Sequence, residues 1–255
     1  MEVFLNPNAW VALLTLTFLE IVLGIDNIIF ISIATGKLPA EKRKKATKLG
    51  MFLAMFMRIA LLFGINLLIQ MKEPWFHIDF SWFSAGVTGQ SVILLLGGLF
   101  LIYKSTNEIR EKVEEKGEEE KEIKDAATKS FQNVILQIIM IDLVFSFDSI
   151  LTAVGMTNGV EGALYIMITA VVISVFIMMQ FAVPVGNFVN KHPSIQILGL
   201  AFLILIGMML LTESAHLSEA LIFGNHVTPL PKGYLYFAIT FSLVVEMINM
   251  KIKKK

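Results

Sequence analysis

The chain has no cysteine and few charged residues, and both shortages limit what it can be. Without cysteine, disulfide frameworks and thiolate metal sites are excluded. Only 16% of the 255 residues are charged, whereas an ordinary soluble domain carries about 25%. Hydrophobic residues make up 56% of the chain and fall in long runs. This composition predicts a multi-pass membrane protein with no soluble module.

Seven apolar segments are long enough to cross a bilayer, which takes about 20 residues in a helix. The predicted spans are residues 9–34, 46–69, 87–103, 132–156, 162–183, 195–212 and 233–250. Pro184 is expected to end or kink the fifth span. We therefore expect an all-α membrane protein with seven transmembrane helices in a single domain, residues 1–255.

Lysine and arginine are distributed unevenly between the two sides that seven spans define. Eighteen of the 21 lie in the first, third and fifth connections and in the C-terminal tail. The other side holds only Lys72 and Lys232, and Arg58 lies inside the second span. Because positive residues favour the cytoplasmic side, we expect the N-terminus outside and the C-terminus in the cytoplasm. The charged segment 104–130 is then a cytoplasmic connection.

Two of the spans each contain a pair of acidic residues six positions apart. Glu20 and Asp26 lie in LEIVLGIDNIIF, and Asp142 and Asp148 lie in MIDLVFSFDSIL. Charged groups at membrane depth are energetically expensive and usually mark a functional site. Two pairs in register suggest that one site has been duplicated.

The duplication predicts an inverted repeat. The first and fourth spans cross the membrane in opposite directions, so residues 9–105 and 131–213 are candidate repeats of three spans each. The final helix, 233–250, is appended to them. Transporters built from inverted repeats bind their substrate near the bilayer midplane, where the repeats meet.

Helical spacing places part of each acidic motif on one face. At about 100° per residue, Glu20, Gly24 and Asn27 share a face of the first span. The equivalent residues of the fourth span are Asp142, Ser146 and Ser149. Asp26 and Asp148 lie about 120° from these faces. Either they point at a different neighbour, or each helix unwinds near the site, and both alternatives stay open.

The charges inside the spans do not balance. Arg58 is the only basic residue there, and we expect it to pair with a carboxylate. Glu246 of the seventh span brings the carboxylates to five. The surplus indicates either a bound cation or protonated carboxylates that hydrogen-bond between helices. Candidate cation ligands are Glu20, Asp26, Asn27, Asp142, Asp148, Ser149 and Glu246, supported by Arg58, Gln180 and Asn249.

The chemistry of these side chains limits which cations they can bind. These side chains offer carboxylate, amide and hydroxyl oxygens, and no histidine lies within a predicted span. Hard oxygen ligands suit magnesium, calcium and manganese better than copper or zinc.

The blocks GIDNIIF, FSFDSILTAVGM and FSLVVEMIN resemble the TerC family of integral membrane proteins, in particular a bacterial inner-membrane subgroup. The resemblance covers essentially the whole chain. It implies relationship to the LysE-type transporter superfamily and export of a divalent metal, manganese above all. It also implies that Glu20, Asp26, Asp142 and Asp148 carry the metal. The chain departs at Leu151, where many members have proline.

The predicted function is therefore a secondary transporter that exports a divalent cation, coupled to protons. The expected partners are the cation, protons and the lipid bilayer, with a homo-oligomer left open and no nucleic acid. We expect no enzymatic activity, no catalytic residue and no cofactor. One alternative is a non-transporting membrane partner in metal delivery or stress resistance. A remote alternative is an intramembrane aspartyl protease, in which Asp26 and Asp148 share a proton.

Overall fold

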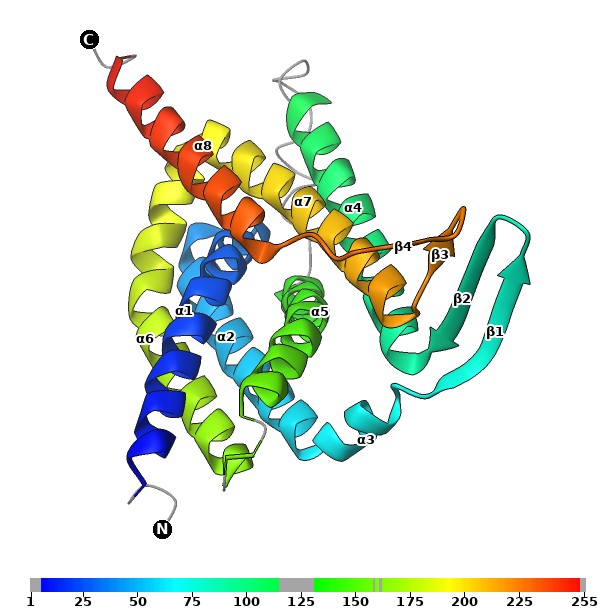
Figure 1. Cartoon of the computed structure of the whole chain (residues 1–255). Coiled ribbons are helices and arrows are strands. Elements are labelled where there is room, and N and C mark those ends of the chain that lie inside the picture. Colours follow the sequence, from blue (N-terminus) through cyan, green and yellow to red (C-terminus); the bar gives the residue numbers. More distant parts are fainter. Residues whose placement is uncertain (1–5, 115–130, 158, 161, 253–255) are drawn as a thin grey trace. The chain divides into compact units, whose positions relative to one another are not determined.

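Long helices dominate the computed structural model of the chain (Figure 1). It describes residues 6–114, 131–157, 159–160 and 162–252, and all of their side chains except those of Ile25 and Asp26. The long helices are α1 (Pro7–Gly36), α2 (Ala40–Phe63), α4 (Gly89–Glu114), α5 (Phe131–Met156), α6 (Ala163–Lys191), α7 (Pro193–Leu217) and α8 (Lys232–Ile252). In the described part of the chain, these seven are long and apolar enough to cross a membrane. The predicted all-α membrane fold with seven spans is confirmed.

A short helix and a small sheet occupy connections for which no regular structure was predicted. The helix α3 is Ile65–Gln70, and the strands are β1 (Pro74–Phe80), β2 (Phe83–Thr88), β3 (Leu221–Ile222) and β4 (Asn225–His226). The strands form one antiparallel sheet in the order β1-β2-β3-β4. Because β2 pairs with β3, the α2–α4 and α7–α8 connections lie on the same side of the membrane, as seven spans require.

The helices divide into two compact units. The first unit, Met1–Ile65 with Glu120–Lys191, contains α1, α2, α5 and α6, and the second, Asn66–Glu119 with His192–Lys255, contains α4, α7, α8 and the sheet. Each unit therefore takes helices from both predicted repeats. In the first unit α1 packs along α6 and α2 packs along α5. The predicted repeat relates α1 to α5 and α2 to α6, so it would map one of these packed pairs onto the other. The inverted repeat itself stays a prediction.

Glycines allow close helix packing within each unit. In the first unit, a Cβ added at Gly186 of α6 would lie 3.1 Å from the Ser32 hydroxyl of α1. In the second unit, a Cβ at Gly98 of α4 would lie 2.7 Å from the Gly207 carbonyl oxygen of α7. Such small residues let membrane helices approach until their backbones touch.

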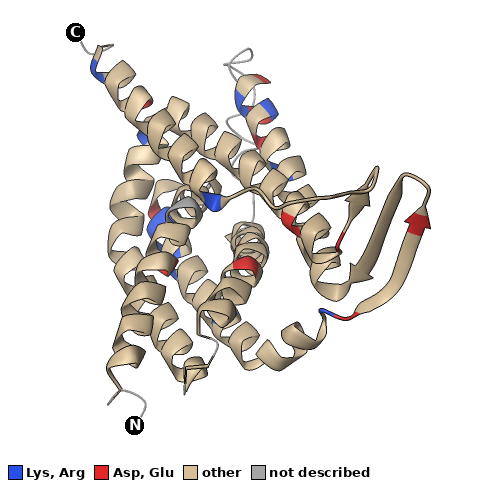
Figure 2. Ribbon diagram, viewed as in Figure 1, with Lys and Arg blue, Asp and Glu red and all other residues tan. Residues whose placement is uncertain are grey.

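Four helices bear on points that the sequence left open or placed differently. Both α1 and α5 are continuous, so neither unwinds at its acidic motif. Helix α6 runs past Pro184 to Lys191, so the proline does not end it. Helix α4 continues through residues assigned to the charged connection, and charged residues gather in its C-terminal half (Figure 2). The remainder of that connection, residues 115–130, lies outside the described residues.

Candidate functional site

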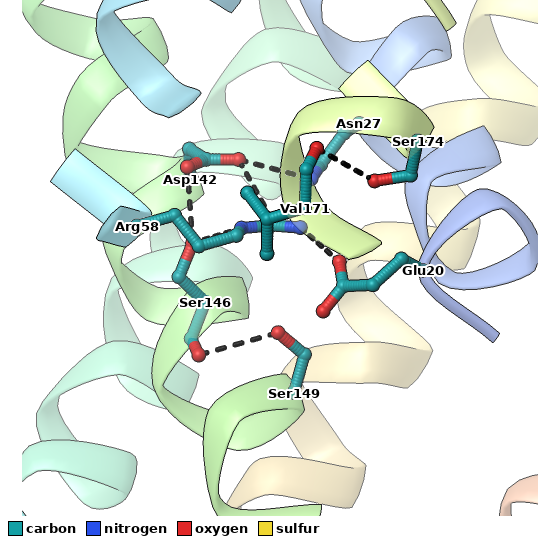
Figure 3. A network of polar contacts seen from close by, with 8 residues as sticks. All are labelled: Glu20, Asn27, Arg58, Asp142, Ser146, Ser149, Val171 and Ser174. Carbon is teal, nitrogen blue, oxygen red and sulfur yellow. Dashed lines mark hydrogen bonds and ion pairs between the residues drawn. The ribbon is translucent and has the colours of Figure 1, made fainter. Parts of the chain in front are cut away.

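Arg58 lies at the centre of a buried polar network in the first unit (Figure 3). It projects from α2 and contacts two neighbouring helices. Its Nη1 donates to Glu20 Oε2 of α1, and its Nη2 donates to Asp142 Oδ1 of α5 at 3.2 Å. Its Nε donates to the Ser146 hydroxyl of α5 at 3.0 Å. The expected pairing of Arg58 is confirmed, with two carboxylates instead of one.

Asp142 receives hydrogen bonds on both carboxylate oxygens. The Asn27 amide of α1 donates to Oδ1 at 3.1 Å, and the Ser146 hydroxyl donates to Oδ2 at 3.0 Å. Helix α1 therefore reaches the network at Glu20 and again two turns later at Asn27. On α5, a spacing of four residues places Ser146 one turn after Asp142, on the same side of the helix.

The shared helical faces predicted from the spacing are confirmed by burial. Glu20, Gly24 and Asn27 are all buried, although they lie in a helix that also exposes large apolar side chains. On α5 the buried set is Asp142, Ser146 and Ser149. Each set forms one polar stripe along an otherwise apolar helix, and the stripes face each other through Arg58 and Asn27.

Two further serines border the network without contacting its charged groups directly. The Ser149 hydroxyl donates to the Ser146 carbonyl at 3.3 Å, and the Ser174 hydroxyl of α6 donates to the Val171 carbonyl at 2.9 Å (Figure 3). Both are buried. Each hydroxyl oxygen keeps lone pairs that can accept a hydrogen bond or coordinate a cation. Ser174 was not predicted as a site residue.

The formal charges of this cluster leave one negative charge in excess. Glu20 and Asp142 share one guanidinium, and their side chains are only 4% and 6% exposed. Removing charges from water costs several kcal/mol each unless they are paired and hydrogen-bonded. The network supplies such partners, but it does not fully neutralise the two carboxylates.

Thr17 of α1 is a site candidate that the sequence analysis missed. Its hydroxyl is buried, lies one turn before Glu20 and has no hydrogen-bond partner among the described residues. The hydroxyl of Thr35, in the same helix, instead donates to the Ile31 carbonyl at 2.7 Å. The three-residue spacing from Glu20 is the sequence feature that could have indicated it.

The other predicted site residues do not all join this network. Asp148 is half-buried on α5, away from the buried stripe. Asp26 lies within α1, but its side chain is outside the described residues. Gln180 is exposed on α6 and has no hydrogen bond to the described members of the network. Glu246 and Asn249 belong to α8 in the second unit, with the Asn249 amide 3.5 Å from Glu246 Oε2.

Metal ligation by these residues stays a prediction. Among the described side chains, no three or more histidine, aspartate or glutamate residues are grouped to hold a metal ion. Instead, the guanidinium of Arg58 bridges the carboxylates of Glu20 and Asp142. A cation that bound both carboxylates would have to compete with this arginine.

The second unit buries a carboxylate that had been assigned to the charged connection. Glu108 of α4 is 2% exposed and lies 3.0 Å from Lys104 Nζ. One turn further on, Lys112 Nζ donates to the Gln196 side chain of α7 at 2.5 Å. The contact between Lys112 and Gln196 extends the packing of α4 on α7 beyond the apolar part of the helix.

Long apolar helices around a buried charged network define a multi-pass membrane protein with a polar network buried among its helices. The sequence model of the integral membrane protein TerC family matches residues 5–255. The chain belongs to the TerC family.

Individual relatives agree with this assignment. The UPF0053 inner membrane protein YgdQ of Escherichia coli (strain K12) is 48% identical over 250 residues, which are 98% of this chain and 96% of the relative. A UPF0053 protein of Haemophilus influenzae is 44% identical over 249 residues, with the same two coverages. The UPF0053 inner membrane protein YoaE of E. coli K12 is 42% identical, but only 44% of its length is covered. No solved structure matches the chain. With its apolar helices, the chain is a multi-pass inner-membrane protein.

Proposed function

We propose that this protein is a secondary transporter that exports a divalent metal cation, with manganese as the expected substrate. The proposal rests mainly on the convergence of Glu20 and Asp142, from two different helices, inside apolar spans. Intramembrane carboxylates that face one another mark ion pathways in membrane proteins. The formal excess of negative charge favours a cation over an anion such as tellurite.

The donor atoms support a hard divalent ion. Glu20 and Asp142 supply carboxylate oxygens, and Ser146, Ser149 and Thr17 supply hydroxyl oxygens nearby on the same two helices. Oxygen ligands of this kind suit manganese, magnesium and calcium. Asp26, Asp148 and Glu246 remain further candidate ligands along the pathway.

In the proposed transport cycle, Arg58 competes with the cation for the carboxylates of Glu20 and Asp142. In the structure it supplies the positive charge that Glu20 and Asp142 need. An arriving divalent cation takes over that role, and the guanidinium moves away from at least one carboxylate. When the cation leaves, Arg58 or protons neutralise the carboxylates again, which provides a route to proton coupling.

We propose transport in preference to catalysis. An aspartyl protease needs two carboxylates that share a proton. Asp148, one of the two aspartates considered for that role, lies outside the buried network. The buried pair Glu20 and Asp142 is bridged by the guanidinium of Arg58. With the N-terminus outside and the C-terminus in the cytoplasm, as the lysine distribution favours, the sheet lies on the outer side and export runs towards it.

Flux measurements on purified protein test the proposal. Proteoliposomes are loaded with a metal-sensitive dye, and uptake of manganese, magnesium, calcium and zinc is followed with and without a pH gradient. Asp142→Asn should abolish manganese flux, because it removes one of the converging charges. Asp79→Asn, which changes an exposed acid on β1, is the matched control and should transport normally.

Two results would contradict the proposal. Wild-type flux from Asp142→Asn protein would show that the buried network is not the ion site. A folded wild-type protein that moved none of the four metals would favour the alternative of a non-transporting membrane partner.

A further inference from the structure

Strands β1 and β2 give the four-stranded sheet one mainly apolar and one mainly polar face, with Leu221 on the polar side and Asn225 on the apolar side as exceptions. Residues directly opposite each other in an antiparallel pair share a face. The register therefore places the pairs Phe76–Val87, Ile78–Ala85, Phe80–Phe83 and Phe83–Ile222 on one face. It places the pairs His77–Gly86 and Asp79–Ser84 on the other. We call this element the amphipathic sheet.

Part of the apolar face remains exposed, although Ala85 of β2 is buried. Phe76 is 54% exposed, Phe80 is 63% exposed, and Ile222 is also exposed. No described residue buries these side chains, although a water-facing apolar surface on a sheet promotes aggregation. The only Asp, Glu, Lys or Arg in the four strands is Asp79, on the polar face (Figure 2).

Two aromatic side chains extend the apolar surface at the turns. Trp82 lies in the β1–β2 turn and Phe223 in the β3–β4 turn, and their ring centroids are 6.3 Å apart. The Phe223 amide donates to the Trp82 carbonyl at 2.8 Å, which holds the two turns together. Phe223 is the more exposed, at 76%, even though its positive φ of 49° is unfavourable for a side chain of this size.

The sheet is attached directly to the ends of two membrane spans. Strand β2 ends at Thr88 and α4 begins at Gly89. The Gly86 amide donates to the carbonyl of Ser218, the residue that follows α7, at 2.8 Å. Thr88 and Ser91 also exchange side-chain to backbone hydrogen bonds of 3.0 and 3.1 Å at the start of α4. The sheet therefore begins directly at the end of a candidate membrane span.

We propose that the amphipathic sheet lies in the lipid–water interface, with its apolar face on the lipids and its polar face towards water. A seven-residue strand reaches about 23 Å, whereas the headgroup layer is only about 5–8 Å deep. An upright hairpin would thus carry Phe80 and Trp82 into water, whereas a hairpin lying along the surface keeps them at the depth that aromatic residues prefer. Because β1 is an edge strand with open backbone groups, it belongs in the hydrated interface and not in the hydrocarbon core.

Tryptophan fluorescence tests this placement, because the chain has only Trp10, Trp75 and Trp82. A protein that keeps Trp82 alone is made by Trp10→Phe and Trp75→Phe. It is reconstituted into nanodiscs whose phospholipids are brominated either near the headgroup or near the end of the acyl chain. Trp82 should lose most of its emission with the shallow label and less with the deep label, and acrylamide in water should quench it weakly.

A pair of adjacent residues on opposite faces provides the control. In the Trp82-only protein, Phe80→Asp should shift quenching from lipid to acrylamide, whereas Asp79→Asn should leave both unchanged. Strong acrylamide quenching without lipid quenching in the parent protein would place the sheet in water and overturn the proposal. Protection from both quenchers would show that protein covers the sheet, and would overturn it as well. Neither result depends on which ion is transported.

Discussion

Replacing Arg58 with glutamine should destabilise the protein strongly. The substitution leaves Glu20 and Asp142 buried without the cation that both contact. Removing one partner of a buried ion pair costs about 3–5 kcal/mol. The hydrogen bonds from Asn27 and Ser146 to Asp142 remain and offset part of the loss. We therefore expect about 3–4 kcal/mol less free energy of unfolding than in the wild type.

Removing all three charges together should restore most of that stability. The triple variant Glu20→Gln, Arg58→Gln, Asp142→Asn keeps polar groups of similar size but leaves no buried ion. A complete buried ion-pair cluster contributes little net stability compared with well-packed hydrophobic residues of similar volume. The amides of the triple variant can still hydrogen-bond to one another, so it should lie within about 1–2 kcal/mol of the wild type. The single substitutions would then be strongly non-additive, as expected for side chains in one network.

Unfolding in mixed micelles, followed by fluorescence, measures these differences. The matched control is Arg110→Gln, because Arg110 pairs with Glu114 at 3.3 Å but both side chains are largely exposed. An exposed pair contributes only about 0–1 kcal/mol, so this variant should resemble the wild type. The reasoning would be refuted if Arg58→Gln were as stable as Arg110→Gln, or if the triple variant were as unstable as Arg58→Gln.

Two further substitutions separate stability from transport. Thr17→Val removes a buried hydroxyl that has no partner among the described residues, so stability should stay equal or rise by about 1 kcal/mol. Manganese flux should nevertheless fall if Thr17 supplies an oxygen to the ion, and unchanged flux would remove it from the site. Gly98→Leu forces a Cβ to within 2.7 Å of the Gly207 carbonyl oxygen and should lower the unfolding free energy by about 1–3 kcal/mol. A thermal melt with Leu95→Ala as the exposed control checks this, and an unchanged melting temperature would contradict the close packing of α4 on α7.

The polar stripes could be predicted from the sequence because the helical repeat alone determines them. Glu20 and Asn27 are seven residues apart, and Asp142 and Ser146 are four apart, so each pair must share a face of a straight helix. The scarcity of basic residues in the spans made Arg58 the obvious partner. Its contact with two carboxylates depends on how α1, α2 and α5 pack, which the spacing does not determine.

The amphipathic sheet could not be predicted, because its pairing is a tertiary contact. Strands β3 and β4 have two residues each and carry no periodic pattern, and β3 pairs with β2 from a distant part of the chain. The aromatic residues of β1 alternate weakly with polar ones around a bulge near Trp75. Only the register of the paired strands shows that Phe76 and Phe80 lie on the same face of the sheet.

Two helices extend beyond the apolar spans that were predicted from hydropathy. Helix α4 continues past its apolar part because Lys104 and Glu108 pair one turn apart and because Glu108 is buried. Helix α6 continues past Pro184, as membrane helices can when neighbouring groups satisfy the freed backbone carbonyl.

Manganese flux through the triple variant Glu20→Gln, Arg58→Gln, Asp142→Asn is the most direct test of the central claim that the buried charges serve ion transport. The protein should insert and unfold much like the wild type in proteoliposomes, yet move no manganese. Transport at the wild-type rate by this neutral variant would contradict the account.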